Sequence, residues 1–171
     1  MDRTENPGHW QKLLVARVHL PIPGPSDFYL EPGGDAAFAW QMFGGLSLEE
    51  AYVEFLKDPW LRQEDFSWML PKAFEYYYPV VDRYLRSVNI HDEDECHEDG
   101  CEARGLGFSI ESQFHWTGGA RPADYVVREI RRLSLFVRGH LSHYSKDPEE
   151  RARIDESWRK LDETVSQTGV S

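Results

Sequence analysis

The sequence predicts a mainly α protein, a single compact helical domain of five to seven helices over residues 1–171. A length of 171 residues is that of one ordinary domain, and a hydrophobic content of 40% is enough for a packed core despite a formal net charge of −11. Apolar residues recur at helical spacing in two long stretches, 71–88 and 122–144. Capping boxes at 47–50 and 147–150 mark two helix starts. Together these patterns favour helices packed around one core.

Prolines and glycines divide the N-terminal part of the chain. Residues 9–20 are apolar enough to form an element, but their mixed period leaves helix and strand open, and the proline-rich stretch 21–25 ends it. A buried helix is expected over residues 35–43, which are apolar nearly all round. Asp35 is the expected capping residue, and the glycine pair 44–45 ends the helix.

The capping box at Ser47 begins a helix expected over residues 48–57. The Ser47 hydroxyl accepts a free backbone N–H of the first turn, and the Glu50 carboxylate reaches back to another. The helix ends at Asp58, because a residue that precedes a proline is disfavoured in the helical region. One more short helical stretch is expected over residues 63–70.

Residues 71–88 carry a strong helical pattern. Pro71 suits the first turn, and one stripe at 3.6-residue spacing holds Phe74, Tyr77, Tyr78, Val81, Tyr84, Leu85 and Val88. Pro79 lies inside this stripe and has no N–H for the carbonyl of Glu75. The sequence therefore predicts a kink at Pro79 or two abutting helices.

The C-terminal half begins with an ambiguous segment, residues 105–116. Its apolar residues alternate as in a strand, while Leu106, Ile110 and Phe114 also share a helical face. Helix is favoured, and a short strand pair with residues 12–20 is the open alternative. Two helices follow, with expected inward faces of Val126, Ile130, Leu133, Val137, Leu141 and Tyr144, and of Ile154, Trp158, Leu161 and Val165.

The acidic charge is concentrated in one segment. Residues 91–102 contain seven carboxylates and no Lys or Arg, so the rest of the chain carries a net charge of only about −4. Such a charge offers no basic face to a nucleic acid or an anionic membrane, whereas a basic protein partner fits it. Arg128, Arg131, Arg132 and Arg138 do give one helix a basic flank, for which the protein's own carboxylates are the expected partners.

The location expected for this protein is the cytoplasm. Residues 1–8 lack the order of a signal peptide, and no apolar run approaches the roughly 18 residues of a membrane span. In the cytoplasm, the two cysteines of the chain are expected as thiols or metal thiolates.

A candidate metal site lies within the acidic segment. His91, Cys96, His97 and Cys101 supply the four nitrogen and sulfur ligands that zinc prefers. However, Cys96 and His97 are adjacent, and the paired knuckles of strong zinc motifs are missing. Residues 89–104 are therefore interpreted first as a solvated acidic His/Cys loop, with zinc binding as the alternative. Here Asp92, Glu93, Asp94 and Glu95 are the carboxylates expected to contact a partner.

A second candidate metal site joins two helices. Glu111 and His115 are four residues apart, and His140 and His143 lie one turn apart at the end of the long helix. The competing interpretation is a half-buried His140 bonded to a carbonyl or water.

Aromatic residues crowd the region from Trp60 to Tyr78. Core packing explains most of them, but Tyr76 points away from the apolar stripe and is the expected exposed contact with a partner. No catalytic residue is assigned, because the chain lacks the nucleophile elbow, the P-loop, the dinucleotide fingerprint and H-E-x-x-H.

The segment from Glu64 to Pro79, EDFSWMLPKAFEYYYP, together with 46–56, resembles an uncharacterised family of small bacterial proteins. That family has a segment of the type W-x-F-L-x-P-x-A-F-x-Y-Y-x-P, and the resemblance covers residues 43–88. It implies a mainly helical fold and brings no known activity. In size and acidity the chain is also similar to bacterial immunity proteins. The expected function is thus a non-enzymatic protein-binding domain, immunity-like or regulatory, and the alternative is a metal-binding protein or metalloenzyme.

Overall fold

The protein is mainly α. The computed structural model describes residues 7–28, 34–87, 102–115 and 121–169, and this part of the chain contains eight α-helices and no strand. A single antiparallel bridge joins Phe28 and Met69. The strand-pair alternative is therefore wrong: residues 7–15 and 102–112 are helical.

Contacts within the chain divide it into two compact units, residues 1–87 and 88–171, and each is described by itself. A single domain over residues 1–171 stays a prediction. The loop predicted over 89–104 is too long at its C-terminal end, because a helix already begins at Glu102.

The described residues of the first unit form five α-helices and two 3-10 helices. Aromatic rings fill its interior: Phe43 contacts Phe66 and Tyr77 at centroid distances of 5.3 and 5.6 Å, and Phe55 contacts Phe66 at 5.7 Å. All four side chains are fully buried, as expected for large aromatic residues in a close-packed core. In chain order the elements are α1 (Pro7–Val15), η1 (Pro25–Asp27), α2 (Asp35–Phe43), α3 (Leu48–Phe55), α4 (Pro59–Arg62), η2 (Gln63–Trp68) and α5 (Pro71–Ser87).

Local capping explains where α3 begins. The Ser47 side chain accepts a hydrogen bond from the Glu50 N–H, and the Glu50 carboxylate accepts one from the Ser47 N–H. This confirms the predicted capping box. The helix ends at Phe55, two residues before the predicted end. At α2 the predicted bounds are correct, but the capping position belongs to Gly34, and Asp35 is the first helical residue.

The long helix α5 runs unbroken from Pro71 to Ser87, so the alternative of two abutting helices is wrong. The carbonyl that Pro79 leaves without its helical donor belongs to Glu75. Nε of Arg17 donates to this oxygen at 2.6 Å, and the Arg17 side chain is 1% exposed. A buried guanidinium thus supplies the hydrogen bond that proline cannot.

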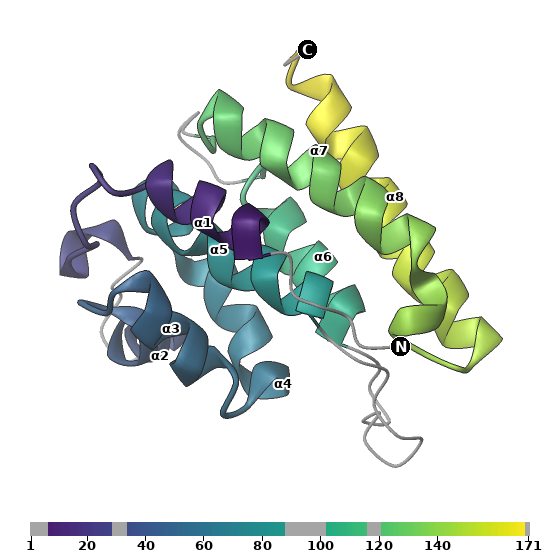
Figure 1. The fold of residues 1–171 in the computed structure, drawn as a ribbon, viewed down its shortest axis with the longest axis horizontal. Helices are drawn as coiled ribbons and strands as arrows, with labels where there is room; N and C mark the ends of the chain where they lie inside the picture. Colours follow the sequence, from purple (N-terminus) through teal and green to yellow (C-terminus); the bar gives the residue numbers. More distant parts are fainter. Residues whose placement is uncertain (1–6, 29–33, 88–101, 116–120, 170–171) are drawn as a thin grey trace. The chain divides into compact units, whose positions relative to one another are not determined.

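The second unit contains α6 (Glu102–Ser112), α7 (Asp124–Gly139), η3 (Leu141–His143) and α8 (Pro148–Gln167). Helix α8 packs against both α6 and α7 (Figure 1). The predicted inward face of α8 is confirmed, because Ile154, Trp158, Leu161 and Val165 are fully buried. On α7 the prediction holds for Val126, Ile130, Leu133 and Val137, which are also fully buried. Leu141 and Tyr144 lie beyond the end of α7, and of these two only Tyr144 is buried.

Helix α6 settles the ambiguity in favour of helix for residues 105–112, whereas residues 113–115 form a turn and residue 116 lies outside the described residues. Leu106 and Ile110 are fully buried, whereas Phe108, between them, is 66% exposed. A close approach to α8 fixes this orientation: a Cβ on Gly107 would lie 2.7 Å from Oγ of Ser157 and 3.1 Å from Nε1 of Trp158. Glycine is thus required where α6 meets α8.

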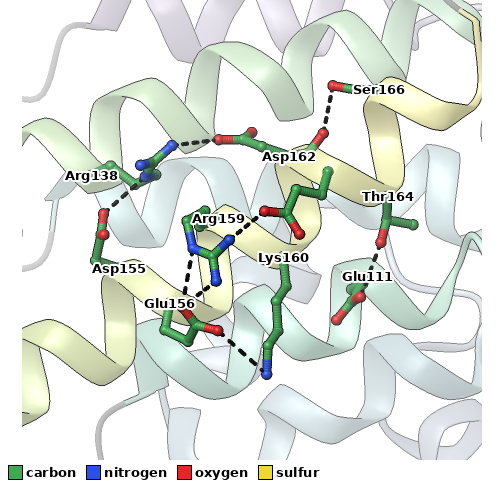
Figure 2. A network of polar contacts seen from close by, with 10 residues as sticks. Glu111, Arg138, Asp155, Glu156, Arg159, Lys160, Asp162, Thr164 and Ser166 are labelled. Carbon is green, nitrogen blue, oxygen red and sulfur yellow. Dashed lines mark hydrogen bonds and ion pairs between the residues drawn. The ribbon is translucent and has the colours of Figure 1, made fainter.

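Ion pairs and hydrogen bonds cover the surface of α8 (Figure 2). Arg138 of α7 donates from Nε to Asp155 and from Nη1 to Asp162, both at 2.9 Å. Thr164 donates to Glu111 of α6 at 3.0 Å. These contacts are half-buried, and they join α8 to both of its neighbours in the second unit.

Within the four described segments, no helix is long and apolar enough to cross a membrane.

Candidate functional site

The residues of the predicted His/Cys site, His91, Cys96, His97 and Cys101, lie outside the described residues. The same is true of the predicted partner-binding carboxylates Asp92, Glu93, Asp94 and Glu95. Among the side chains that are described, no three His, Cys, Asp or Glu residues form a group that could hold a metal ion. Zinc at the His/Cys segment therefore stays a prediction from the sequence.

The four residues of the second predicted metal site do not form such a group. Glu111 Oε1 lies 3.4 Å from Nε2 of His115, and the same oxygen accepts the hydrogen bond of Thr164 at 3.0 Å. The His115 side chain is 64% exposed. Glu111 therefore belongs to the contact between α6 and α8, with His115 at the protein surface.

His140 and His143 are not on the long helix, contrary to the prediction. Helix α7 ends at Gly139, His140 is its C-terminal cap, and His143 belongs to η3. Nδ1 of His140 donates to the carbonyl of Phe136 at 2.6 Å, and the two rings stack with centroids 4.2 Å apart. A His140 bonded to a carbonyl is the competing interpretation of the sequence, and the structure shows this contact.

The prediction that Tyr76 is an exposed contact with a partner is wrong. Its side chain is 7% exposed, and its ring packs edge-on against Tyr77 at a centroid distance of 4.9 Å. Burial, followed by the nearby charges of Glu49 and Glu50, raises the pKa of the Tyr76 phenol. The helical-stripe argument failed because α5 is buried on nearly all of its sides, so residues off the stripe also lie in the core.

A buried polar cluster between α1 and α5 was missed by sequence analysis. The Asp82 carboxylate is 1% exposed and accepts hydrogen bonds at Oδ1 from Nε2 of His9 at 2.7 Å and from Nε of Arg86 at 2.8 Å. Tyr78 OH lies 3.5 Å from the other oxygen. Arg86 is the expected i,i+4 partner of Asp82, but His9 is 73 residues away in sequence, so only the fold could place it here.

Next to this cluster, an arginine is held between two aromatic rings. The Arg83 guanidinium lies 4.1 Å from the ring centroid of Tyr52 and 4.7 Å from that of Trp10. Cation–π contacts of this kind add stability when the cation is partly desolvated. Together with His9 and Asp82, they attach α1 to α5 (Figure 1). The arrangement is that of a structural contact between helices.

Exposed apolar and acidic residues follow one another along α3, its C-terminal cap and α4, and we call residues 49–61 the α3–α4 surface. Val53, Leu56 and Leu61 are 61%, 47% and 58% exposed. Glu49 stands one helical turn before Val53, and Asp58 lies between Leu56 and Leu61. The Asp58 side chain accepts the N–H of Leu61 at 3.0 Å, so this carboxylate is fixed at the start of α4.

Asp65, in η2, makes the stability of the folded protein depend on pH. The side chain is buried, and desolvation raises its pKa from 3.8 to about 6, although Arg62 at 3.4 Å acts in the opposite direction. Between these two values the unfolded chain loses the proton while the folded protein keeps it, so the stability contributed by Asp65 falls as the pH rises through this window and is constant above it.

We expect Asp65→Asn to raise the free energy of unfolding by up to roughly 3 kcal/mol at pH 8 and to have little effect at pH 4, because it removes a buried charge only where that charge exists. Urea unfolding at both pH values measures the difference. Asp58→Asn, at an exposed cap, is the matched control. Equal gains for Asp65→Asn at both pH values would contradict this assignment.

Comparisons with known proteins identify no relative: no family model, no curated protein and no solved structure matches this chain. The α3–α4 surface and the acidic segment 91–102 are therefore the two features from which a function can be argued.

Proposed function

We propose that the protein is a non-enzymatic, cytoplasmic protein-binding domain, immunity-like or regulatory, whose partner is a basic protein. The observation that carries the proposal is the α3–α4 surface, where three large apolar side chains are exposed among carboxylates. Exposed apolar residues bordered by polar ones are typical of interaction sites.

The negative charges of the chain support a positively charged partner. Glu49 and Glu50 are exposed at the start of α3, and Lys57, the one basic residue among residues 49–61, forms an ion pair with Glu54. The sequence adds the seven carboxylates of residues 91–102. A basic partner would gain long-range attraction from both, and an apolar patch on it would cover Val53 and Leu56.

The proposal is tested by crosslinking in the cells that express the protein, followed by identification of the attached protein. We expect a basic partner that is recovered with the unchanged chain and lost with Val53→Asp/Leu56→Asp, since two charges in an apolar contact reduce affinity by about tenfold or more. Val18→Asp is the control, because Val18 is 82% exposed and lies away from α3 and α4 in the sequence.

Calorimetry with the purified partner completes the test. Affinity should fall as ionic strength rises from about 0.1 M to 1 M, because the Debye length shortens from about 10 Å to about 3 Å. A partner that is acidic, or one whose binding tolerates both the salt and Val53→Asp/Leu56→Asp, contradicts the proposal.

Metal content separates this proposal from the alternative of a metal-binding protein. We expect elemental analysis of protein purified without an affinity tag to find less than one equivalent of zinc, nickel or iron, because adjacent Cys96 and His97 are poorly spaced for one ion. One full equivalent of zinc that Cys96→Ser removes would instead establish a site at His91, Cys96, His97 and Cys101.

A further inference from the structure

Helix α7 has one buried face and one exposed face. Val126, Ile130, Leu133 and Val137 are fully buried. Opposite them, Arg128, Arg132 and Leu135 are exposed at i, i+4 and i+7, and Leu135 is 72% exposed. Arg131 is half-buried beside them. We call these four residues the α7 arginine face.

The arginines of this face differ from the other arginines around them. Arg138, at the end of the same helix, is held by Asp155 and Asp162, and Arg121 pairs with Asp124 at 2.9 Å. In contrast, the side chains of Arg128, Arg131 and Arg132 form no hydrogen bond or ion pair with any residue of the described segments. The prediction that all four arginines pair with the protein's own carboxylates is thus confirmed only for Arg138.

The composition of the face fits a protein partner that carries carboxylates. Arginine is enriched at protein interfaces and binds carboxylates through two parallel hydrogen bonds. Leu135 adds an apolar contact in line with the two exposed arginines, which a phosphate backbone would not use. A nucleic acid would also be repelled by the net charge of −11, so it is a poorer occupant.

The complementary chemistry is present in the chain itself. Residues 91–102 contain seven carboxylates and no basic residue. Residues 103–171, which include α7, contain 11 basic and 10 acidic residues, so this part of the chain is nearly neutral and its local arginines are not masked by a surplus of acids. Opposite charges placed in different segments of one chain allow two copies to associate reciprocally.

We propose that the α7 arginine face binds the acidic segment 91–102 of a second copy of this chain. In a closed dimer each α7 receives the carboxylates of the other copy, so both contacts form together. The proposal is separate from the proposed function, because its test needs this chain alone. A basic partner that took the same carboxylates would dissociate the dimer.

Sedimentation of the full-length protein over a range of concentrations tests this inference. We expect a monomer–dimer equilibrium that shifts toward monomer as ionic strength rises, because the attracting charges are exposed. Arg128→Glu/Arg132→Glu should raise the dissociation constant by about tenfold or more, since each change removes an attraction and adds a repulsion. Arg128→Gln/Arg132→Gln should act in the same direction with a smaller effect, and circular dichroism checks that α7 stays folded in both variants.

The matched control is Lys12→Glu/Lys72→Glu. Both lysines are exposed and form no ion pair within the described part of the chain, so this variant has the same net charge as Arg128→Glu/Arg132→Glu without touching α7. It should self-associate nearly as the unchanged protein does. An equal loss in the control would show a general effect of net charge and would overturn the proposal.

A charge exchange distinguishes a direct contact from an indirect effect. Asp92→Lys/Asp94→Lys should self-associate more weakly than the unchanged protein, and mixing it with Arg128→Glu/Arg132→Glu should form a heterodimer that is tighter than the homodimer of either variant, because one of its two contacts joins an unchanged segment to an unchanged α7. A protein that is monomeric at every concentration and salt, including the case in which the acidic segment binds α7 of its own chain, overturns the proposal. So does a dimer that is insensitive to the α7 variants, or a mixture that fails to pair.

Discussion

Replacement of Trp158 by alanine is expected to lower the free energy of unfolding by about 3–5 kcal/mol. Trp158 is the largest fully buried side chain, and its Nε1 donates a hydrogen bond to the carbonyl of Ala103 at 2.8 Å. The change leaves a cavity where α6 and α8 meet and removes the donor to that carbonyl. Guanidinium unfolding followed by circular dichroism measures the loss.

Two further variants test whether the loss of stability comes from the contact between α6 and α8. Arg159→Ala removes the next side chain along α8, whose ion pairs with Glu156 and Glu163 are exposed, and it should change stability by less than about 1 kcal/mol. Gly107→Ala should destabilise the same contact from the other side, because its Cβ meets Ser157 and Trp158. If Trp158→Ala proved no more harmful than Arg159→Ala, the assigned packing of α6 on α8 would be wrong.

Asp82→Ala is expected to destabilise the protein by about 3 kcal/mol at neutral pH. The carboxylate is 1% exposed and holds both His9 and Arg86, so its removal takes one charged partner from a partly buried guanidinium and breaks the contact of His9 with α5. Urea unfolding measures the loss, and proteolysis near residue 16 should become faster as α1 detaches.

The double change His9→Ala/Asp82→Ala isolates the contact between the helices. If His9 and Asp82 act together, the sum of the stability losses of the two single variants should exceed the stability loss of the double variant by about 1 kcal/mol or more. Asp124→Ala is the control, since that carboxylate is 60% exposed and pairs only with Arg121 in the described segments. Strict additivity of His9→Ala and Asp82→Ala would contradict a direct role for their 2.7 Å contact.

Local rules were sufficient for most helices. The Ser47 capping box, the Pro71 start and the stripes around Leu133 and Trp158 all depend on residues within a few positions of one another, and the structure confirms each. The errors occur at helix ends: α7 stops at Gly139, although its apolar pattern continues to Tyr144. A periodic pattern records which residues are buried, and the turn after Gly139 buries Tyr144 without continuing the helix.

The candidate sites were harder to predict, because they depend on distance in space. Sequence spacing paired Glu111 with His115 correctly but could not show that Glu111 also faces Thr164. A one-sided stripe on α5 predicts an exposed Tyr76, but α5 is buried on nearly all of its sides and Tyr76 is 7% exposed. Helical spacing predicts Leu56 on the core face with Ala51, Tyr52 and Phe55, and this prediction is wrong, because Leu56 is 47% exposed. The exposure of Val53 follows only from the packing of α3 in the fold.

The amino-acid sequence alone predicts the helical class, the starts of α3, α5 and α8, and the position of the negative charge at 91–102. These follow from hydrogen bonds, periodicity and composition over a few consecutive residues. Three features required the tertiary structure: Arg17 reaches the Glu75 carbonyl that Pro79 leaves open, His9 joins Asp82, and the exposed Arg128 and Arg132 form no hydrogen bond or ion pair within the described segments. Each of these depends on which helices pack together, and that packing minimises exposed apolar area over residues far apart in the chain.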